Sequence, residues 1–284
     1  MASSNDNNND VETDFFPFYR LYKDGRVDVS MNLDWCISAR LYLPKNTAPD
    51  QKLPVLLYYH GGGFVLGSAF FKTEHCYLNH LVFESNCIAI SVDYRLAPEH
   101  DIHTIYQDCW DAIQWVASHS VSDTINRDPW IENHSNFNHV FVGGDSAGGN
   151  IVYNMIMRAG REKLIGDLKI LGAILGFPLL LIPSIENFDK GLMIIQWLIQ
   201  SRQRALTYRC MLGCSRLFVC TGEKDELILA EVGTKFVEAV KKSGWKGEIE
   251  LIEVEGEVHA FQCENPQAPK SKHLIKRIAS FIQR

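Results

Sequence analysis

The chain has 284 residues, 46% of them hydrophobic and 22% charged, and its 34 acidic and 28 basic side chains give a formal net charge of −6. This composition is typical of a globular protein and excludes a strongly basic nucleic-acid-binding surface. No apolar run reaches the roughly 18 residues that a membrane-spanning helix needs. We therefore expect a globular protein with no nucleic-acid partner and no membrane span, and the sequence leaves its oligomeric state open.

The beginning of the chain predicts a disordered tail. The stretch MASSNDNNNDVE is polar and low in complexity, without the cationic start and apolar stretch of a secretion signal. We expect a tail over 1–13, a single α/β domain over 14–284 and a cytoplasmic location. The eight cysteines fit reduced thiols in such a protein. Cys210, Cys214 and Cys220 lack a CxxC pair or a matching histidine, so we expect no metal and no other cofactor.

Short runs that are apolar on both faces alternate with helical patterns along the chain. The predicted strands are 55–59, 87–92, 140–143, 170–177, 217–220 and 249–254. The predicted helices, with apolar residues on one face, are 105–116, 151–159, 229–240 and 274–282. Strands apolar on both faces are typical of a sheet covered by helices on both sides. The alternation predicts a mostly parallel, doubly wound α/β sheet with its site outside the carboxyl ends of the strands.

The first predicted strand is followed by three glycines in YYHGGGF, residues 58–64. Backbone without side chains can approach a ligand closely and direct N–H groups at a negative charge. We interpret Gly61, Gly62 and Gly63 as part of an oxyanion hole, to which the N–H of Ala147 also contributes. The alternative is an ordinary flexible turn.

The third predicted strand leads into GDSAG, residues 144–148, which fits the pattern G-x-S-x-G. In this pattern a sharp strand-to-helix turn lifts the serine hydroxyl clear of the backbone, and only small neighbours permit the turn. Ser146 is therefore a candidate nucleophile. The alternative is a glycine-rich turn with a helix-capping serine, because short motifs also match by chance.

A serine nucleophile needs a base, and the base needs a group that orients it. Asp225 follows the strand RLFVC, and His259 follows the next strand, EIELIEV, so we expect both at carboxyl ends of the sheet. The order Ser, Asp, His is the one that α/β-hydrolases use. Glu223 and Glu226 are rivals to Asp225, which we prefer because an apolar helix begins immediately beyond it.

Six ordered motifs, HGGGF, DYRLAPEH, GDSAGGN, GCSRLFV, KKSGWKGEIEL and GEVHAF, resemble the plant carboxylesterases in the hormone-sensitive-lipase-like branch of the α/β-hydrolases. The resemblance covers most of the chain beyond the tail and implies an α/β-hydrolase fold. It implies Ser146 as nucleophile, His259 as general base and then acid, and Asp225 as the group that orients the base. It also implies that Arg95 and Glu99 of DYRLAPEH form a buried structural pair.

The chain is shorter than that family's pattern at two places. One lies between KDGRVDV and ISARLYLP, and the other between LGFPLLL and GCSRLFV. In relatives the second stretch supplies a helical cap and part of the substrate pocket. We expect a reduced cap over 182–212, with an apolar helical block at 193–199 in which Trp197 can stack on a substrate ring.

The sequence predicts a serine hydrolase that cleaves small or medium hydrophobic carboxylic esters through an acyl-enzyme. The aromatic side chains expected near the pocket mouth are Phe15, Phe16, Phe64 and Phe70. Two alternatives stay open, because the resemblance includes 2-hydroxyisoflavanone dehydratase and alkaloid cyclases as well as the gibberellin receptor. A dehydratase or cyclase would use the same pocket without hydrolysis. The receptor has lost the histidine of the triad, and His259 therefore argues against a binding module.

Overall fold

The structure is a computed structural model of the chain. It describes residues 37–45, 47–121, 128–180 and 212–284 and, by backbone alone, residues 11–15, 19–22 and 26–30. Of the tail predicted over 1–13, residues 1–10 lie outside the described residues. Within the described ranges, no helix has both the length and the apolar character needed to cross a membrane.

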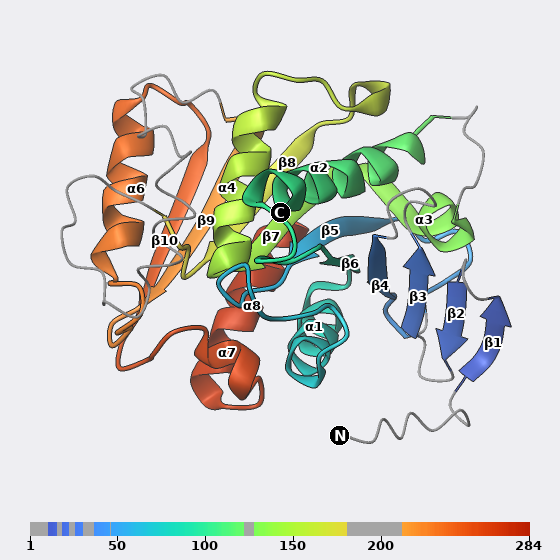
Figure 1. The fold of residues 1–284 in the computed structure, drawn as a ribbon, viewed down its shortest axis with the longest axis horizontal. Coiled ribbons are helices and arrows are strands. Elements are labelled where there is room, and N and C mark those ends of the chain that lie inside the picture. Colours follow the sequence, from blue (N-terminus) through green and yellow to red (C-terminus); the bar gives the residue numbers. More distant parts are fainter. Residues whose placement is uncertain are drawn as a thin grey trace.

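A ten-stranded sheet in the order β1-β2-β3-β4-β6-β5-β7-β8-β9-β10 forms the centre of the molecule (Figure 1). Its strands are β1 (Val11–Phe15), β2 (Tyr19–Tyr22), β3 (Arg26–Ser30), β4 (Ser38–Tyr42), β5 (Leu53–Tyr59), β6 (Ile88–Asp93), β7 (Ser135–Asp145), β8 (Ile170–Gly176), β9 (Cys214–Gly222) and β10 (Glu248–Val254). The six strands β6, β5, β7, β8, β9 and β10, in this order, are parallel. Strands β1 to β4 pair antiparallel with one another, and β4 pairs antiparallel with β6. The six predicted strands are the six parallel ones, which confirms the mostly parallel sheet. The four antiparallel strands were not predicted.

Helices cover both faces of the parallel strands. They are α1 (Lys72–Ser85), α2 (Ile102–Ser118), α3 (Pro129–His134), α4 (Ala147–Ala159), α6 (Glu231–Lys242), α7 (Phe261–Glu264) and α8 (Pro269–Gln283), with a 3₁₀ turn η2 (Ile165–Asp167). Helices α2, α4 and α6 pack into one apolar core, and α1 and α8 pack into the other. Figure 1 shows α2 and α4 in front of the sheet. The four predicted helices correspond to α2, α4, α6 and α8.

Strand β5 shows how the sequence builds these two cores. Val55, Leu57 and Tyr59 belong to one core, whereas Leu56 and Tyr58 belong to the other. Side chains alternate along a strand, so a strand covered on both faces requires an unbroken apolar run. The burial of both faces fixes β5 in the middle of the sheet, and its carboxyl end leads into the three glycines.

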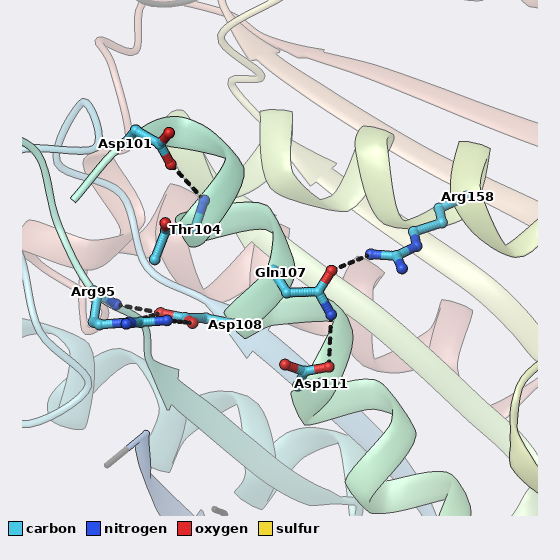
Figure 2. Close-up of polar contacts among 7 residues, drawn as sticks. All are labelled: Arg95, Asp101, Thr104, Gln107, Asp108, Asp111 and Arg158. Carbon is cyan, nitrogen blue, oxygen red and sulfur yellow. Dashed lines mark hydrogen bonds and ion pairs between the residues drawn. The ribbon is translucent and has the colours of Figure 1, made fainter. Parts of the chain in front are cut away.

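Helix α2 anchors the segment that follows β6 (Figure 2). Asp108, whose side chain is 1% exposed, accepts hydrogen bonds from Arg95 Nη2 at 2.5 Å, Nε at 2.9 Å and the backbone N–H at 3.1 Å. Asp101 caps the same helix by accepting a hydrogen bond from the N–H of Thr104 at 2.8 Å. Glu99 is exposed. The predicted pair of Arg95 and Glu99 was therefore wrong, and the acid comes from the following helix.

Replacing Asp108 with Ala removes all three of these hydrogen bonds and leaves the partly buried guanidinium of Arg95 without its carboxylate. We expect the free energy of unfolding to fall by about 3 kcal/mol, as for other ion pairs broken on one side. Urea denaturation measures the change. Glu99→Ala is the matched control, and we expect it to change the free energy by less than about 0.5 kcal/mol. Equal losses in the two variants would contradict the assignment of Asp108.

Candidate active site

A pocket of about 470 Å³ is lined by residues that follow β5, β7, β8, β9 and β10. Its wall contains Ser146, His259 and the three glycines at 61–63. The remainder is mainly apolar and includes Val65, Leu66, Phe71, Leu179, Leu227 and Ile228. The structure therefore brings the predicted nucleophile, the predicted base and the glycine loop together at the carboxyl ends of the strands, where doubly wound sheets place their sites.

Ser146 occupies a sharp turn between β7 and α4. Its φ is 56°, in the left-handed region that non-glycine residues seldom adopt, and its N–H donates to Gly176 O at 2.8 Å. A Cβ on Gly148 would lie 1.9 Å from Tyr59 O, and a Cβ on Gly144 would lie 2.6 Å from the same oxygen. Both glycines are needed for α4 to begin against the end of β5. The pattern G-x-S-x-G predicts such a turn.

The glycine loop after β5 carries backbone N–H groups that face no acceptor from the described segments. Gly62 and Gly63 have φ values of 105° and 63°, and a Cβ on Gly62 would lie 2.1 Å from Leu66 O. Among the described residues, the N–H groups of Gly62, Gly63 and Ala147 donate to no acceptor. Ala147 is the first residue of α4, where the helix dipole also favours negative charge. These donors suit the binding of an oxyanion.

His60 is hydrogen-bonded to the glycine loop and does not line the pocket. Its buried ring stacks on Tyr94 with 4.2 Å between the centroids. Nδ1–H donates to Gly61 O at 2.7 Å, and the Tyr94 hydroxyl donates to His60 O at 2.7 Å. Burial lowers the pKa of His60, so the imidazole is neutral at pH 7. The histidine of the motif therefore positions the loop and takes no part in proton transfer.

Asp225 and His259 form a hydrogen-bonded pair. His259 Nδ1 lies 2.7 Å from Asp225 Oδ2, and the Asp225 side chain is 1% exposed. The other oxygen, Oδ1, accepts hydrogen bonds from the N–H groups of Leu227 at 2.9 Å and Ile228 at 2.8 Å. These two backbone donors fix the carboxylate, which in turn fixes the imidazole.

The two rival acids do not contact His259. Glu223 Oε2 accepts a hydrogen bond from the N–H of Gly256 at 2.7 Å, at the surface. Glu226 is exposed and does not line the pocket. The geometry therefore favours Asp225, as the sequence analysis does.

Ser146 and His259 face the same pocket, although no hydrogen bond joins their side chains within the described part of the chain. Contacts between a nucleophile and its base are often long without substrate and tighten in the complex. The Phe177 ring lies edge-on to the imidazole, with 5.7 Å between the centroids, and restricts its movement. Because Nδ1 is bonded to Asp225, Nε2 is the ring nitrogen that remains available for another partner.

Asp145, next to the candidate nucleophile, has a different environment from Asp225. It is buried, and it accepts hydrogen bonds from the Tyr58 hydroxyl and from Cys263 Sγ, the latter at 3.6 Å. Burial raises the pKa of Asp145 and the pKa of the Cys263 thiol. A thiol with a raised pKa is a poor nucleophile. Neither group is placed to orient His259.

Glu74 of α1 also lines the pocket, and the sequence analysis did not identify it. It belongs to no recognised motif. The available signal was its position, since Glu74 lies in the first turn of the helix that follows the glycine loop. An acidic residue only about ten positions after the glycine loop can be expected to lie near the same pocket.

Of the four aromatic side chains expected at the pocket mouth, the two that the structure describes do not line the pocket. Phe64 is fully buried in the core. Phe70 does not line the pocket either, whereas Phe71 does and is 54% exposed. The side chains of Phe15 and Phe16 lie outside the described residues. The prediction was therefore wrong for Phe64 and Phe70.

Metal binding finds no support in the described part of the chain. No group of three or more His, Cys, Asp and Glu side chains could hold a metal ion there. Cys214 and Cys220 are buried free thiols, and Cys210 lies outside the described residues.

The chain is similar in sequence and in fold to known α/β-hydrolases. A family model described as the alpha/beta hydrolase fold matches residues 56–263. The chain is 37% identical to 2-hydroxyisoflavanone dehydratase of Glycyrrhiza echinata, over 99% of this chain and 100% of that protein. It is 32% identical to "Probable carboxylesterase 1" of Arabidopsis thaliana, over 96% and 98%. A hyperthermophilic esterase from Pyrobaculum calidifontis has a TM-score of 0.71 at 25% identity, over 91% and 85% of the two chains.

The similarity to the dehydratase extends over 329 residues, which exceeds the 284 residues of this chain. That protein therefore contains residues without a counterpart here. The reduced cap predicted over 182–212, with its block at 193–199 and Trp197, lies outside the described residues except for Leu212. The position of the shortening stays a prediction.

The turn at Ser146 makes a prediction about stability. Gly148→Ala places a methyl group against backbone atoms that cannot move separately, so we expect the free energy of unfolding to fall by about 3 kcal/mol or more. Gly143→Ala is the matched control on the preceding strand, because its nearest neighbour at 3.1 Å is the end of the flexible Leu56 side chain. Urea denaturation of both variants measures the difference. A loss no larger for Gly148→Ala than for Gly143→Ala would contradict this account of the turn.

Proposed function

Because the chain belongs to the alpha/beta hydrolase family, we propose that it is a serine carboxylesterase that cleaves small or medium hydrophobic esters through an acyl-enzyme. One observation carries the proposal. His259 Nδ1 bonds to the buried Asp225 at 2.7 Å in a pocket that also contains Ser146. A serine, an oriented imidazole and free backbone donors are the groups that acyl transfer requires.

Acylation begins with proton transfer from Ser146 Oγ to His259 Nε2 as the oxygen attacks the ester carbonyl. The carbonyl oxygen becomes an oxyanion, which accepts hydrogen bonds from the N–H groups of Gly62, Gly63 and Ala147. Asp225 keeps the Nδ1–H tautomer in place and stabilises the imidazolium. His259 then protonates the leaving alcohol, and the acyl group stays on Ser146.

Deacylation repeats these steps with water. His259 takes a proton from the water, which attacks the acyl carbon, and the oxyanion forms again at the same donors. Collapse of this second intermediate releases the carboxylic acid and returns the proton to Ser146. No step needs a metal or an organic cofactor.

The wall of the pocket supports a hydrophobic substrate of limited size. Its volume of about 470 Å³ lies within the range of small-molecule sites. Leu66, Phe71 and Leu227 line it and remain 68%, 54% and 48% exposed. Covering these apolar side chains with a hydrophobic ligand is favourable, because it removes apolar surface from water.

Dehydration is the second candidate function. The observation in its favour is the 37% identity, over 99% of this chain, to a protein named as a 2-hydroxyisoflavanone dehydratase. A dehydratase would release water from a hydroxylated substrate and give a product lighter by one water. Mass analysis of products separates the two functions, since hydrolysis adds one water.

Ser146→Ala tests the nucleophile. We expect the unchanged protein to hydrolyse 4-nitrophenyl acetate and to gain one fluorophosphonate adduct by intact mass, and the variant to do neither. Its melting temperature should stay close to that of the unchanged protein, because Ser146 lines the pocket and removal of its hydroxyl leaves little buried cavity. An adduct of equal yield on the variant would sink the assignment.

Asp225→Asn tests the group that orients the base. The amide keeps the shape of the side chain but favours the wrong imidazole tautomer, a change that costs about 10⁴-fold in kcat in serine proteases. We expect a loss of that size in ester turnover. Glu223→Gln and Glu226→Gln are matched controls that should keep most of the activity. If either of them is the more damaging change, Asp225 is not the orienting acid.

A further inference from the structure

Glu74, in the first turn of α1, contributes to the pocket wall a carboxyl group that has no partner in the part of the chain that the structure describes. Its Oε2 atom is fully buried and has no hydrogen-bond partner. No hydrogen bond or ion pair to either oxygen occurs among the described residues. The same pocket wall includes the apolar side chains of Val65, Leu66 and Phe71 as well as the carboxyl group of Asp145. A polar group buried in this way has an unmet capacity for hydrogen bonding.

The ionisable groups of the described residues that interact with Glu74 include no Lys or Arg. They are Asp145 after β7, Tyr58 of β5, Tyr94 beyond β6, Tyr77 of α1 and Cys263 of α7, with His259 in the same pocket. On β4, which also packs against α1, Arg40 lies over the Phe70 ring. The Tyr58 hydroxyl and the Cys263 thiol both donate to Asp145.

Glu74 is therefore protonated at neutral pH. Burial, and secondly the nearby Asp145, raise its pKa to about 8. At pH 7 the group is a neutral carboxylic acid with one O–H to donate. Above pH 8 it becomes a carboxylate, which can accept hydrogen bonds but cannot donate one.

We propose that Glu74 is a specificity-determining residue that selects esters carrying an uncharged oxygen acceptor, such as a ketone or an ether, away from the scissile carbonyl. The acceptor completes the hydrogen bond that the protein leaves unmade. The oxygen is uncharged because Asp145, which lines the same pocket and raises the pKa of Glu74, disfavours a further negative charge there. The inference rests on the proposed esterase function, since it names a feature of the substrate of the same site.

Two pairs of esters test the proposal, each differing by one CH₂ replaced with C=O. The acyl pair is 4-nitrophenyl pentanoate and 4-nitrophenyl 4-oxopentanoate. The alcohol pair is 4-butylphenyl acetate and 4-(3-oxobutyl)phenyl acetate. The measured quantity is the ratio of kcat/KM within a pair, corrected for the rates with hydroxide, so a general loss of activity cancels. At pH 7 we expect a preference of about 3- to 10-fold for the ketone in at least one pair.

Three variants and a second pH show whether Glu74 causes the preference. Glu74→Leu removes the donor and should bring the ratio close to one. Glu74→Gln keeps an N–H donor that does not titrate, so its ratio should stay above one at both pH 7 and pH 9. The unchanged protein should lose its preference between these values, because the carboxylate repels the ketone oxygen. Glu84→Gln makes the same charge change on the same helix, outside the pocket wall, and should behave as the unchanged protein does.

Equal ratios in the unchanged protein and Glu74→Leu would overturn the proposal, as would the absence of a ketone preference in both pairs while the plain esters are hydrolysed. In these cases the esterase function still stands. If no ester is hydrolysed, the esterase function fails, and calorimetric Kd values for the same intact pairs replace kcat/KM. A ketone preference that disappears in Glu74→Leu then supports the role of Glu74 in recognition, and equal affinities overturn it.

Discussion

The site depends on the close approach of the backbone of β5 to the first turn of α4. A Cβ on Gly148 would lie 1.9 Å from Tyr59 O, so no side chain fits between the two elements. The glycine loop continues directly from Tyr59, and Ser146 precedes Gly148 by two residues. This single contact therefore sets the distance between the proposed nucleophile and the proposed oxyanion donors. The strained φ of 56° at Ser146 persists because the surrounding strands and the buried face of α4 determine it.

The parallel arrangement of β9 and β10 completes the site. Their last residues, Gly222 and Val254, are partners in the strand pairing, so the loops that follow begin side by side. A Cβ on Gly222 would lie 2.5 Å from Glu257 O, which shows how closely these loops pack. Asp225 and His259, 34 residues apart in the sequence, reach a distance of 2.7 Å as a result. The order of the proposed triad along the chain thus follows from the order of the strands.

The sequence predicted the elements and residues that carry a local sequence pattern. The parallel strands carry apolar runs because both faces are buried, whereas β1 to β4 mix polar and apolar residues and give no such run. Motifs identified Ser146 and the glycine loop. Packing between distant segments gave no local signal, so the sequence analysis missed Asp108 as the partner of Arg95. For the same reason it missed Glu74, whose role depends on what surrounds it rather than on its neighbours in the sequence.

The two carboxyl groups of the site differ in their proposed roles, since Asp225 orients the base and Glu74 recognises the substrate. Asp225 has two backbone donors and an imidazole, and these contacts hold it in one orientation. Glu74 has no such contact with any described residue, and it reaches the pocket from α1, which packs in the core on the opposite side of the sheet from α4. A substitution at Glu74 changes the wall of the pocket and removes none of the hydrogen bonds that hold Asp225 and His259. Substrate preference can therefore diverge while the reacting groups keep their geometry.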